Sequence, residues 1–447
     1  MKLKTLLWVT LFYTVSLFAQ DSMIVSFKLT PEIKAFLRAN EYDVTGVNLK
    51  TNEIEALLTQ NQISDLKFLK ANFNFTFPQA LAPGPSQEYK NPQEIEDFIK
   101  AVHASYPDIT EVKSIGKSWE GREIYAIKIS DNAKASEKEP VIFFNGMHHA
   151  REVMTTEITT DLVDYLTKNY GVKSEVTKWI NDNEIWVIPM YNVDGNNKMW
   201  NEYAMWRKNT HAERGNGVDL NRNYPKDWNA CQGSSVDPYS DVFRGFSPAS
   251  EPETKAMMAF VESIKPVFSI SYHSYSELVL YPYGCSYKKT PALEPVEMIG
   301  KEIAKVLNYT PGTPWEILYN ADGGDMDWMY AEQQVIPYVI EVNSTRAGFH
   351  PDYAKWRNQT VELNRKGWMH LLSRMEGPSI QGLTPDYSII RIHQAGQADA
   401  FQTYKVNPNG TFFVILKPGF YDFTFEGAAK IKKLTNMNIQ KKEVIQL

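Results

Sequence analysis

The chain has only two cysteines, Cys231 and Cys285, among its 447 residues. Two thiols exclude a disulfide-rich scaffold and a structural zinc site built from cysteine. Any bound metal must therefore be held by histidine and carboxylate side chains. The two cysteines can pair in an oxidising compartment, but pairing needs Cα atoms within about 7 Å, so the sequence leaves this bridge open.

Long apolar runs and basic patches are also lacking. The longest apolar run, Leu6 to Phe18, is shorter than the roughly 20 residues that span a bilayer. The formal net charge of -6 creates no basic field for nucleic acid. We therefore expect no membrane span and no nucleic-acid partner.

The first residues have the pattern of an export signal. Lys2 and Lys4 precede the apolar run, and the small residues Ser16 and Ala19 stand at positions compatible with cleavage. The alternative, a membrane anchor, requires a longer run. We predict a signal peptide over residues 1–19 and a secreted or periplasmic protein.

A small α/β module is predicted to follow the signal. A strand-like run spans Met23 to Leu29, a helix begins near Pro31, and a second strand and helix occupy Ile54 to Leu69. Residues 79–86 are rich in proline and glycine, which indicates a linker open to proteolysis. We therefore predict that residues 20–85 are a removable propeptide with its linker.

The central and C-terminal parts have different patterns. Apolar strands at 141–145, 185–189, 267–272 and 338–342 alternate with helical segments, which predicts an α/β domain over residues 86–376. Its sheet should be mixed and mostly parallel, with helices on both faces. Short alternating stretches after Met375 predict a small β-sandwich over residues 381–447.

The strand ending at Asn145 runs directly into candidate metal ligands, His149 and Glu152. Zn²⁺ binds imidazole nitrogen and carboxylate oxygen, and a catalytic site needs a third protein ligand. His273, at the end of another apolar strand, is the best candidate because functional groups gather where α/β strands end. A His-x-x-Glu pair is common by chance, and His148 competes with His149 for the first position.

Several further motifs occur in order along the chain. They are Gly116–Arg122 (GKSWEGR), Met147–Glu152 (MHHARE), Asn192–Gly195 (NVDG), Met205–Asn209 (MWRKN), Val218–Asn223 (VDLNRN), Tyr272–Ser276 (YHSYS), Tyr281–Gly284 (YPYG), Leu318–Tyr319, Gly323–Trp328 (GGDMDW) and Ile340–Glu341. This series resembles the zinc carboxypeptidases of the carboxypeptidase A and B type, and is most similar to their bacterial, broad-specificity member carboxypeptidase T. The resemblance covers roughly residues 89–375.

The resemblance implies one Zn²⁺ bound by His149, Glu152 and His273, and so selects His149 over His148. It implies that Asp219 orients a ligand histidine from outside the metal shell. Glu341 matches the general base, a role that needs a carboxylate beside the metal-bound water. Independently of the family, a glutamate inside an apolar strand indicates function, because burial of an unpartnered carboxylate is costly.

The same resemblance assigns the substrate contacts. Arg207 matches the cation that stabilises the developing oxyanion. Asn221 and Arg222 match the pair that binds the terminal carboxylate of a peptide, and Tyr319 matches the mobile tyrosine that covers it. Further subsite residues are Arg151, Ser274 and Tyr275, although core packing explains the last two nearly as well. The implied partners are the C-termini of peptides or proteins, bound by a monomer.

Side-chain preference depends on the pocket near residues 323–327. In the family an acidic residue at the position of Met326 accompanies Lys/Arg preference, so Met326 favours apolar side chains. Asp325, or Asp322 close by, offers a charge for basic side chains. We therefore expect a broad or hydrophobic preference with acceptance of basic residues.

Two other functions fit parts of this pattern. A cell-wall peptidase of related fold would share the zinc ligands, but Asn221, Arg222 and Tyr319 favour ordinary C-terminal peptides. A catalytically inactive protein that only binds peptide C-termini would be expected to lose a zinc ligand or Glu341, and the chain retains them all.

Overall fold

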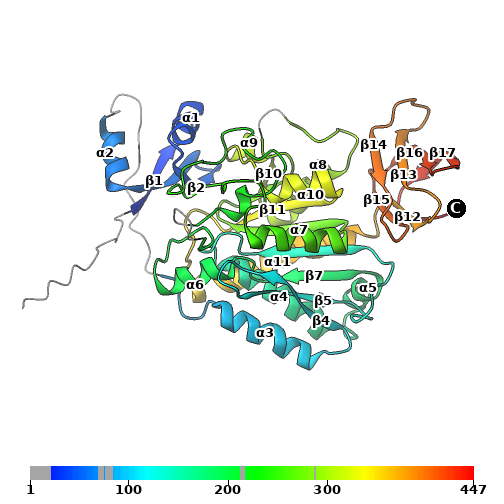
Figure 1. The fold of residues 1–447 in the computed structure, drawn as a ribbon, viewed down its shortest axis with the longest axis horizontal. Coiled ribbons are helices and arrows are strands. Elements are labelled where there is room, and N and C mark those ends of the chain that lie inside the picture. The colour runs from blue at the N-terminus through cyan, green and yellow to red at the C-terminus, as the bar shows by residue number, and fades with distance from the viewer. Residues whose placement is uncertain (1–21, 69–74, 76–83, 212–216, 286–287) are drawn as a thin grey trace, which may run out of the picture.

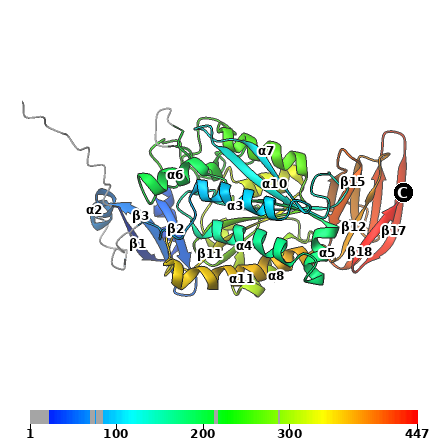
Figure 2. The same ribbon diagram turned by 90° about the horizontal axis from the view of Figure 1, so that it is seen from below.

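The computed structural model describes residues 22–68, 75, 84–211, 217–285 and 288–447. The predicted signal peptide and most of the predicted linker lie outside these residues. The described chain forms a central α/β unit with a small module at each end (Figures 1 and 2). The N-terminal module lies at one end of this unit and the C-terminal strands lie at the other.

The N-terminal module is a three-stranded antiparallel sheet with two helices. Its strands β1 (Ser22–Lys28), β2 (Asp43–Asn48) and β3 (Glu53–Thr59) lie in the order β1-β3-β2. Helix α1 (Pro31–Ala39) begins after Thr30, whose hydroxyl accepts a hydrogen bond from the backbone of Ile33, and α2 (Gln60–Phe68) follows β3. The sequence analysis missed β2, because Asp43, Gly46 and Asn48 interrupt its apolar pattern.

The central unit is built on an eight-stranded mixed sheet in the order β10-β9-β11-β8-β6-β7-β5-β4. Strands β11, β8, β6 and β7 run parallel to one another, as do β9 and β10, whereas the β5–β7, β4–β5 and β9–β11 pairs are antiparallel. The strands are β4 (Thr110–Lys117), β5 (Glu123–Ile129), β6 (Val141–Gly146), β7 (Glu184–Ile188), β8 (Phe268–Ser274), β9 (Leu278–Leu280), β10 (Thr310–Gly312) and β11 (Ile336–Val342). β6, β7 and β8 are buried along their whole length, which explains their mostly apolar segments, although Ser269 and Ser271 interrupt the apolar residues of β8.

Helices cover both faces of this sheet, as predicted. Figure 2 shows α4, α8 and α11 on one side and α7 and α10 on the other. The helices are α3 (Pro92–Ser105), α4 (Met154–Asn169), α5 (Ser174–Asp182), α6 (Val193–Asn201), α7 (Pro252–Ile264), α8 (Val296–Leu307), α9 (Pro314–Ile317), α10 (Asp325–Gln333) and α11 (Tyr353–Arg374). The start of α3 was readable from the sequence, because Asn91 and Glu94 form a capping box around Pro92.

The C-terminal strands form two further sheets that share one apolar core. Strands β12 (Ser379–Leu383), β15 (Thr411–Ile415) and β18 (Lys442–Gln446) make one sheet. Strands β13 (Ile389–Gln394), β14 (Gln402–Lys405), β16 (Gly419–Glu426) and β17 (Ile431–Ile439) make the other. Phe412 and Phe425, one from each sheet, have ring centroids 5.7 Å apart in that core.

Within the described residues, no helix is long and apolar enough to cross a membrane. Cys231 and Cys285 form a disulfide with Cα atoms 5.7 Å apart, which answers the question that the sequence left open.

Candidate active site

The candidate zinc ligands meet where three parallel strands end. His149 and Glu152 follow β6, and His273 is the next-to-last residue of β8. In the parallel ladders Gly146 pairs with Tyr272, and His273 pairs with Glu341 of β11. Parallel pairing therefore brings residues nearly 200 positions apart in the sequence to one edge of the sheet.

The three side chains point their donor atoms at one another. His149 Nδ1 lies 2.7 Å from Glu152 Oε1, and His273 Nδ1 lies 3.2 Å from both His149 Nδ1 and Glu152 Oε2. All three residues are buried, and their ligand atoms lie within 4.8 Å of one another. Two imidazole lone pairs directed at each other repel unless a cation lies between them. The donor set therefore fits Zn²⁺.

Each ligand histidine has a partner for its second ring nitrogen. His149 Nε2 lies 3.3 Å from the carboxylate of Asp219, and His273 Nε2 lies 3.2 Å from the hydroxyl of Ser271. Such partners fix the tautomer that presents Nδ1 to a metal. The sequence analysis missed Ser271. The alternation of a strand could have indicated it, because Ser271 lies two residues before His273 on the same face of β8.

Glu341 lines the small cavity in front of these ligands, together with His149 and His273. Burial, reinforced by the nearby charge of Glu152, raises the pKa of Glu341 to about 7. A carboxylate with this pKa can accept and return a proton near neutral pH, which suits a general base.

Arg207 is connected to the ligand shell through Asp219. Its Nε and Nη2 donate to Asp219 Oδ2 at 3.1 and 2.8 Å. Asp219 Oδ1 also accepts a hydrogen bond from the backbone N–H of Asn221 at 2.9 Å. One buried carboxylate thus contacts a zinc-ligand candidate, the proposed oxyanion cation and the segment that carries Asn221.

The three residues matched to the substrate carboxylate line this cavity. Asn221, Arg222 and Tyr319 all line it, and the Arg222 guanidinium lies 5.8 Å from the Tyr319 ring centroid. Asn221 Oδ1 accepts from the backbone N–H of Asp325 at 3.0 Å, and Arg222 Nε donates to the carbonyl of Gly233 at 2.8 Å. Both side chains are therefore held in place by neighbouring loops.

The side-chain pocket has apolar walls and an acidic edge. Leu280, Leu318, Met326 and Val339 line it, and all four are buried. Asp325 also lines it, and its Oδ2 lies 3.7 Å from His148 Nε2.

Asp322 points away from this pocket. Its Oδ2 accepts hydrogen bonds from the backbone N–H groups of Cys231 and Gly233 at 2.9 and 3.4 Å. Asp322 is not among the residues that line the cavity, so the expectation that it offers a charge to a basic side chain has no support in the structure.

Residues of the N-terminal module contact Arg151 and Tyr275, two of the three remaining predicted subsite residues. Arg151 is fully buried, and its Nη2 lies 2.7 Å from Asp43 of β2. The hydroxyl of Tyr275 donates to Glu55 at 2.8 Å and lies 2.9 Å from the Thr45 hydroxyl. Ser274 is also buried, and its backbone N–H donates to Glu152 Oε2 at 3.2 Å.

A buried His/Glu/His set beside a carboxylate and an arginine is the arrangement of a zinc hydrolase. The family model described as zinc carboxypeptidase matches residues 95–366. Carboxypeptidase B of Canis lupus familiaris is 31% identical over 340 residues, covering 72% of this chain and 79% of the relative. Mast cell carboxypeptidase A of Homo sapiens is 32% identical over 256 residues, covering 54% and 60%.

Solved structures agree on the fold. Bovine thrombin-activatable fibrinolysis inhibitor, in complex with tick carboxypeptidase inhibitor, is 28% identical with a TM-score of 0.58, covering 64% of this chain and 97% of that chain. Carboxypeptidase A from Helicoverpa armigera has a TM-score of 0.67 at 21% identity, covering 79% and 96%. The chain belongs to the zinc carboxypeptidase family. It is a metallo-exopeptidase that hydrolyses C-terminal peptide bonds.

Proposed function

We propose that His149, Glu152 and His273 bind one Zn²⁺, with Asp219 and Ser271 orienting the two histidines. The proposal is supported by the convergence of the three donor groups at one edge of the sheet. When bound there, zinc supplies Lewis acidity that polarises a carbonyl and acidifies a water molecule.

Glu341 accepts the proton of the attacking water and passes it to the leaving amine. Its place in the cavity and its raised pKa support this role. Arg207 binds the developing oxyanion, an interaction that strengthens as negative charge accumulates on that oxygen. Asp219 holds the Arg207 guanidinium in place, which avoids the cost of orienting it during the reaction.

Asn221, Arg222 and Tyr319 bind the terminal carboxylate of the substrate. A planar guanidinium pairs with a carboxylate through two hydrogen bonds, so Arg222 gives this contact both strength and direction. Their place in the cavity that Glu341 also lines is the observation that carries the exopeptidase assignment. A carboxylate bound there leaves only the last peptide bond beside Glu341.

The leaving residue occupies the pocket lined by Leu280, Leu318, Met326 and Val339. These apolar walls support a hydrophobic or broad preference, and Asp325 at the edge supports acceptance of basic side chains. This combination would place the protein beside the broad-specificity bacterial carboxypeptidase T.

The N-terminal module keeps the exported protein latent until the linker within residues 79–88 is cut. Asp43 neutralises Arg151, and Glu55 and Thr45 engage Tyr275, so the module contacts residues proposed for substrate binding. Leu58 and Leu37 of the module share an apolar cluster with Met326 and Leu318 of the pocket.

The mature enzyme acts outside the cytoplasm as a monomer.

Peptides with free and amidated C-termini test the central assignment. The processed enzyme should cleave the free form, lose this activity on chelation, and regain it with Zn²⁺. It should cleave the amidated form poorly, and Arg222→Ala should lower kcat/KM for the free form by about 10-fold to 100-fold with little effect on the amidated form. Equal cleavage of both forms by the parent enzyme would contradict binding of the terminal carboxylate by Asn221, Arg222 and Tyr319. Turnover of cell-wall peptides alone would favour the alternative, a cell-wall peptidase of related fold.

A further inference from the structure

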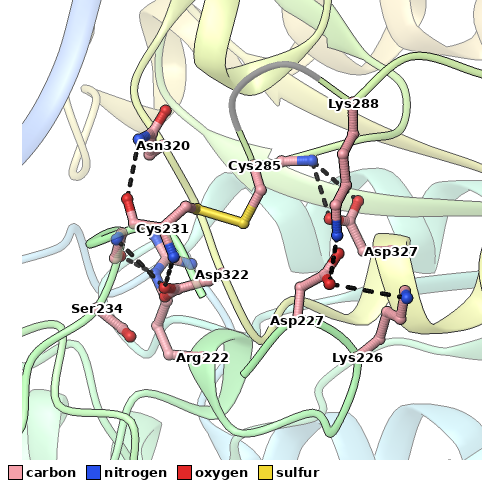
Figure 3. The surroundings of a disulfide bond; sticks show 12 residues. Arg222, Lys226, Asp227, Cys231, Ser234, Cys285, Lys288, Asn320, Asp322 and Asp327 are labelled. Atoms are coloured by element: carbon pink, nitrogen blue, oxygen red, sulfur yellow. Dashed lines mark hydrogen bonds and ion pairs between the residues drawn. A yellow bond between two sulfur atoms is a disulfide. The ribbon is translucent and has the colours of Figure 1, made fainter. Parts of the chain in front are cut away.

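A short turn, Cys231 to Gly233, contacts Arg222 and the loop that follows Tyr319, and so borders the proposed carboxylate grip (Asn221, Arg222 and Tyr319). On one side the carbonyl of Gly233 accepts the Nε–H of Arg222 at 2.8 Å. On the other side the backbone N–H groups of Cys231 and Gly233 donate to Asp322, three residues after Tyr319. Figure 3 shows Arg222 and Asp322 converging on this turn. The turn thus links Arg222 to Asp322 through hydrogen bonds of its backbone.

A second set of hydrogen bonds fastens the loop that carries Tyr319. Asn320 Nδ2 donates to the carbonyl of Cys231 at 2.9 Å, and the backbone N–H of Ala321 donates to the carbonyl of Gly284 at 3.1 Å. Gly284 in turn donates its N–H to both carboxylate oxygens of Asp327, at 3.0 and 2.9 Å. The Tyr319 loop is therefore held between the segments that contain Cys231 and Cys285.

Backbone packing on both sides of this loop is too close for side chains. A Cβ atom on Gly233 would lie 2.4 Å from the carbonyl oxygen of Asn320, and one on Gly284 would lie 2.2 Å from that of Ala321. A Cβ on Gly323 would lie 2.3 Å from the carbonyl oxygen of Arg222, and Gly323 has a φ of +65°. Glycine at these positions lets three chain segments meet directly.

The disulfide closes this arrangement. Cys231 and Cys285 are 54 residues apart in the sequence, and their bond ties together the two segments that hold the Tyr319 loop (Figure 3). Residues 223–251 contain no helix and no named strand, and the β-type pairing nearest the turn is one isolated bridge between Ser235 and Phe243. The covalent bond supplies the constraint that a sheet would otherwise give.

We propose that the disulfide-held turn Cys231–Gly233 sets the geometry of the carboxylate grip, and that Asp322 is the positioning residue that locks the Tyr319 loop onto it. The inference rests on the proposed roles of Arg222 and Tyr319. Asp322 touches no substrate and acts through the turn. Its loss should weaken capture of every peptide with a free C-terminus, whatever the side chain of the last residue.

Steady-state kinetics of Asp322→Ala tests this inference. The variant is assayed as the processed chain, which begins near Tyr89. Loss of hydrogen bonds to a charged group should raise KM by about tenfold for free C-terminal substrates ending in Phe and in Lys alike, with kcat within about threefold of the parent. Bound zinc should stay at one per chain. Asp322→Asn retains an acceptor oxygen for both N–H groups and should restore KM to within about twofold. The double variant Cys231→Ser/Cys285→Ser should shift KM in the same direction.

Lys288→Ala is the matched control. Lys288 pairs with Asp227 at 2.5 Å beside the same disulfide, but it contacts neither Arg222 nor the Tyr319 loop in the described contacts, so KM should change less than about twofold. An unchanged KM in Asp322→Ala would overturn the proposal. A rise in KM confined to substrates ending in Lys would also overturn it, because Asp322 would then recognise the charge of the last side chain.

Thermal unfolding separates these outcomes from misfolding. If Asp322→Ala does not fold, the KM values of Asp322→Asn and of the cysteine double variant decide by the same criterion. If none of these variants folds, the turn is only structural and the proposal fails. Failure of the exopeptidase assignment looks different, because the parent enzyme itself would then cleave free and amidated peptides equally.

Discussion

The two end modules are attached to the central unit in different ways. The N-terminal module reaches the zinc-site edge with buried charged and hydroxyl groups, such as Asp43 on Arg151 and Glu55 on Tyr275. The C-terminal strands have an apolar core of their own, and Ile415 and Phe413 of β15 also pack against the central apolar core. Hydrogen bonds add to this junction. One of these is the 2.8 Å hydrogen bond from Arg374 Nη2 to the carbonyl of Leu416.

Because of this difference, the N-terminal contact can regulate activity, whereas the C-terminal contact only attaches its strands to the central unit. A buried ion pair is costly to form and strongly destabilising when one partner is removed, so it responds sharply to a local change. At the N-terminal end the partner of the ion pair is a predicted substrate-binding residue. At the C-terminal end no residue assigned to the active site takes part in the described junction contacts. Perturbing each end should therefore affect activity differently.

The largest expected effect is on the metal ligands beside the N-terminal module. His273→Ala removes one of three donors, and the processed enzyme should lose both zinc and activity. Metal content by atomic emission and turnover of a blocked dipeptide measure the two losses together. Full zinc occupancy with normal turnover would exclude His273 as a ligand.

Glu341→Gln should lower kcat by about 10² to 10⁴ while zinc and substrate still bind, because the change removes a base but no ligand. Kinetics with parallel metal analysis tests the prediction. A kcat within a few-fold of the parent would show that another group accepts the proton.

The contact of the N-terminal module with Arg151 and Tyr275 is tested by measuring activity before the linker is cut. The chain beginning near Gln20 should be at least about tenfold less active than the chain beginning near Tyr89, and Asp43→Ala should raise the activity of the longer chain by weakening a buried ion pair. Glu53→Ala is the control, because Glu53 pairs with Lys28 inside the module. Equal activity of the long and short chains would refute latency.

The pH profile gives a smaller effect. The pKa of Glu341, raised to about 7, means that the ionised base accumulates as pH rises through that value. Bound zinc stabilises the carboxylate, so the acid limb of kcat/KM should lie between about pH 5 and 7. Glu341→Gln should remove this limb from the residual activity. An unchanged limb in that variant would assign it to a different group.

The smallest effect on activity is expected at the C-terminal junction. Arg374→Met keeps most of the side-chain volume but removes the hydrogen bond to Leu416, which should cost about 1.5 to 3 kcal/mol of stability. The melting temperature should fall by a few degrees while kcat/KM stays within about twofold. A large loss of activity at full folding would show that the C-terminal strands communicate with the active site.

Much of the central fold was predictable from local pattern. Mostly apolar segments identified β6, β7, β8 and β11, because both faces of these strands are largely buried. The ordered motifs around His149, His273 and Glu341 marked the candidate site. β2 was missed because its polar and glycine residues meet other parts of the protein, and local pattern does not report those contacts.

The sequence alone predicted which residues carry chemistry, since donor type, strand-end position and motif order are local properties. Only the tertiary structure decided how these residues are held. Parallel pairing places Glu341 beside His273, Ser271 supports a zinc-ligand candidate, and Asp322 turns from the substrate pocket toward Cys231. The pairing of Cys231 with Cys285 also depended on the fold, because a distance between two loops 54 residues apart is set by packing and not by spacing.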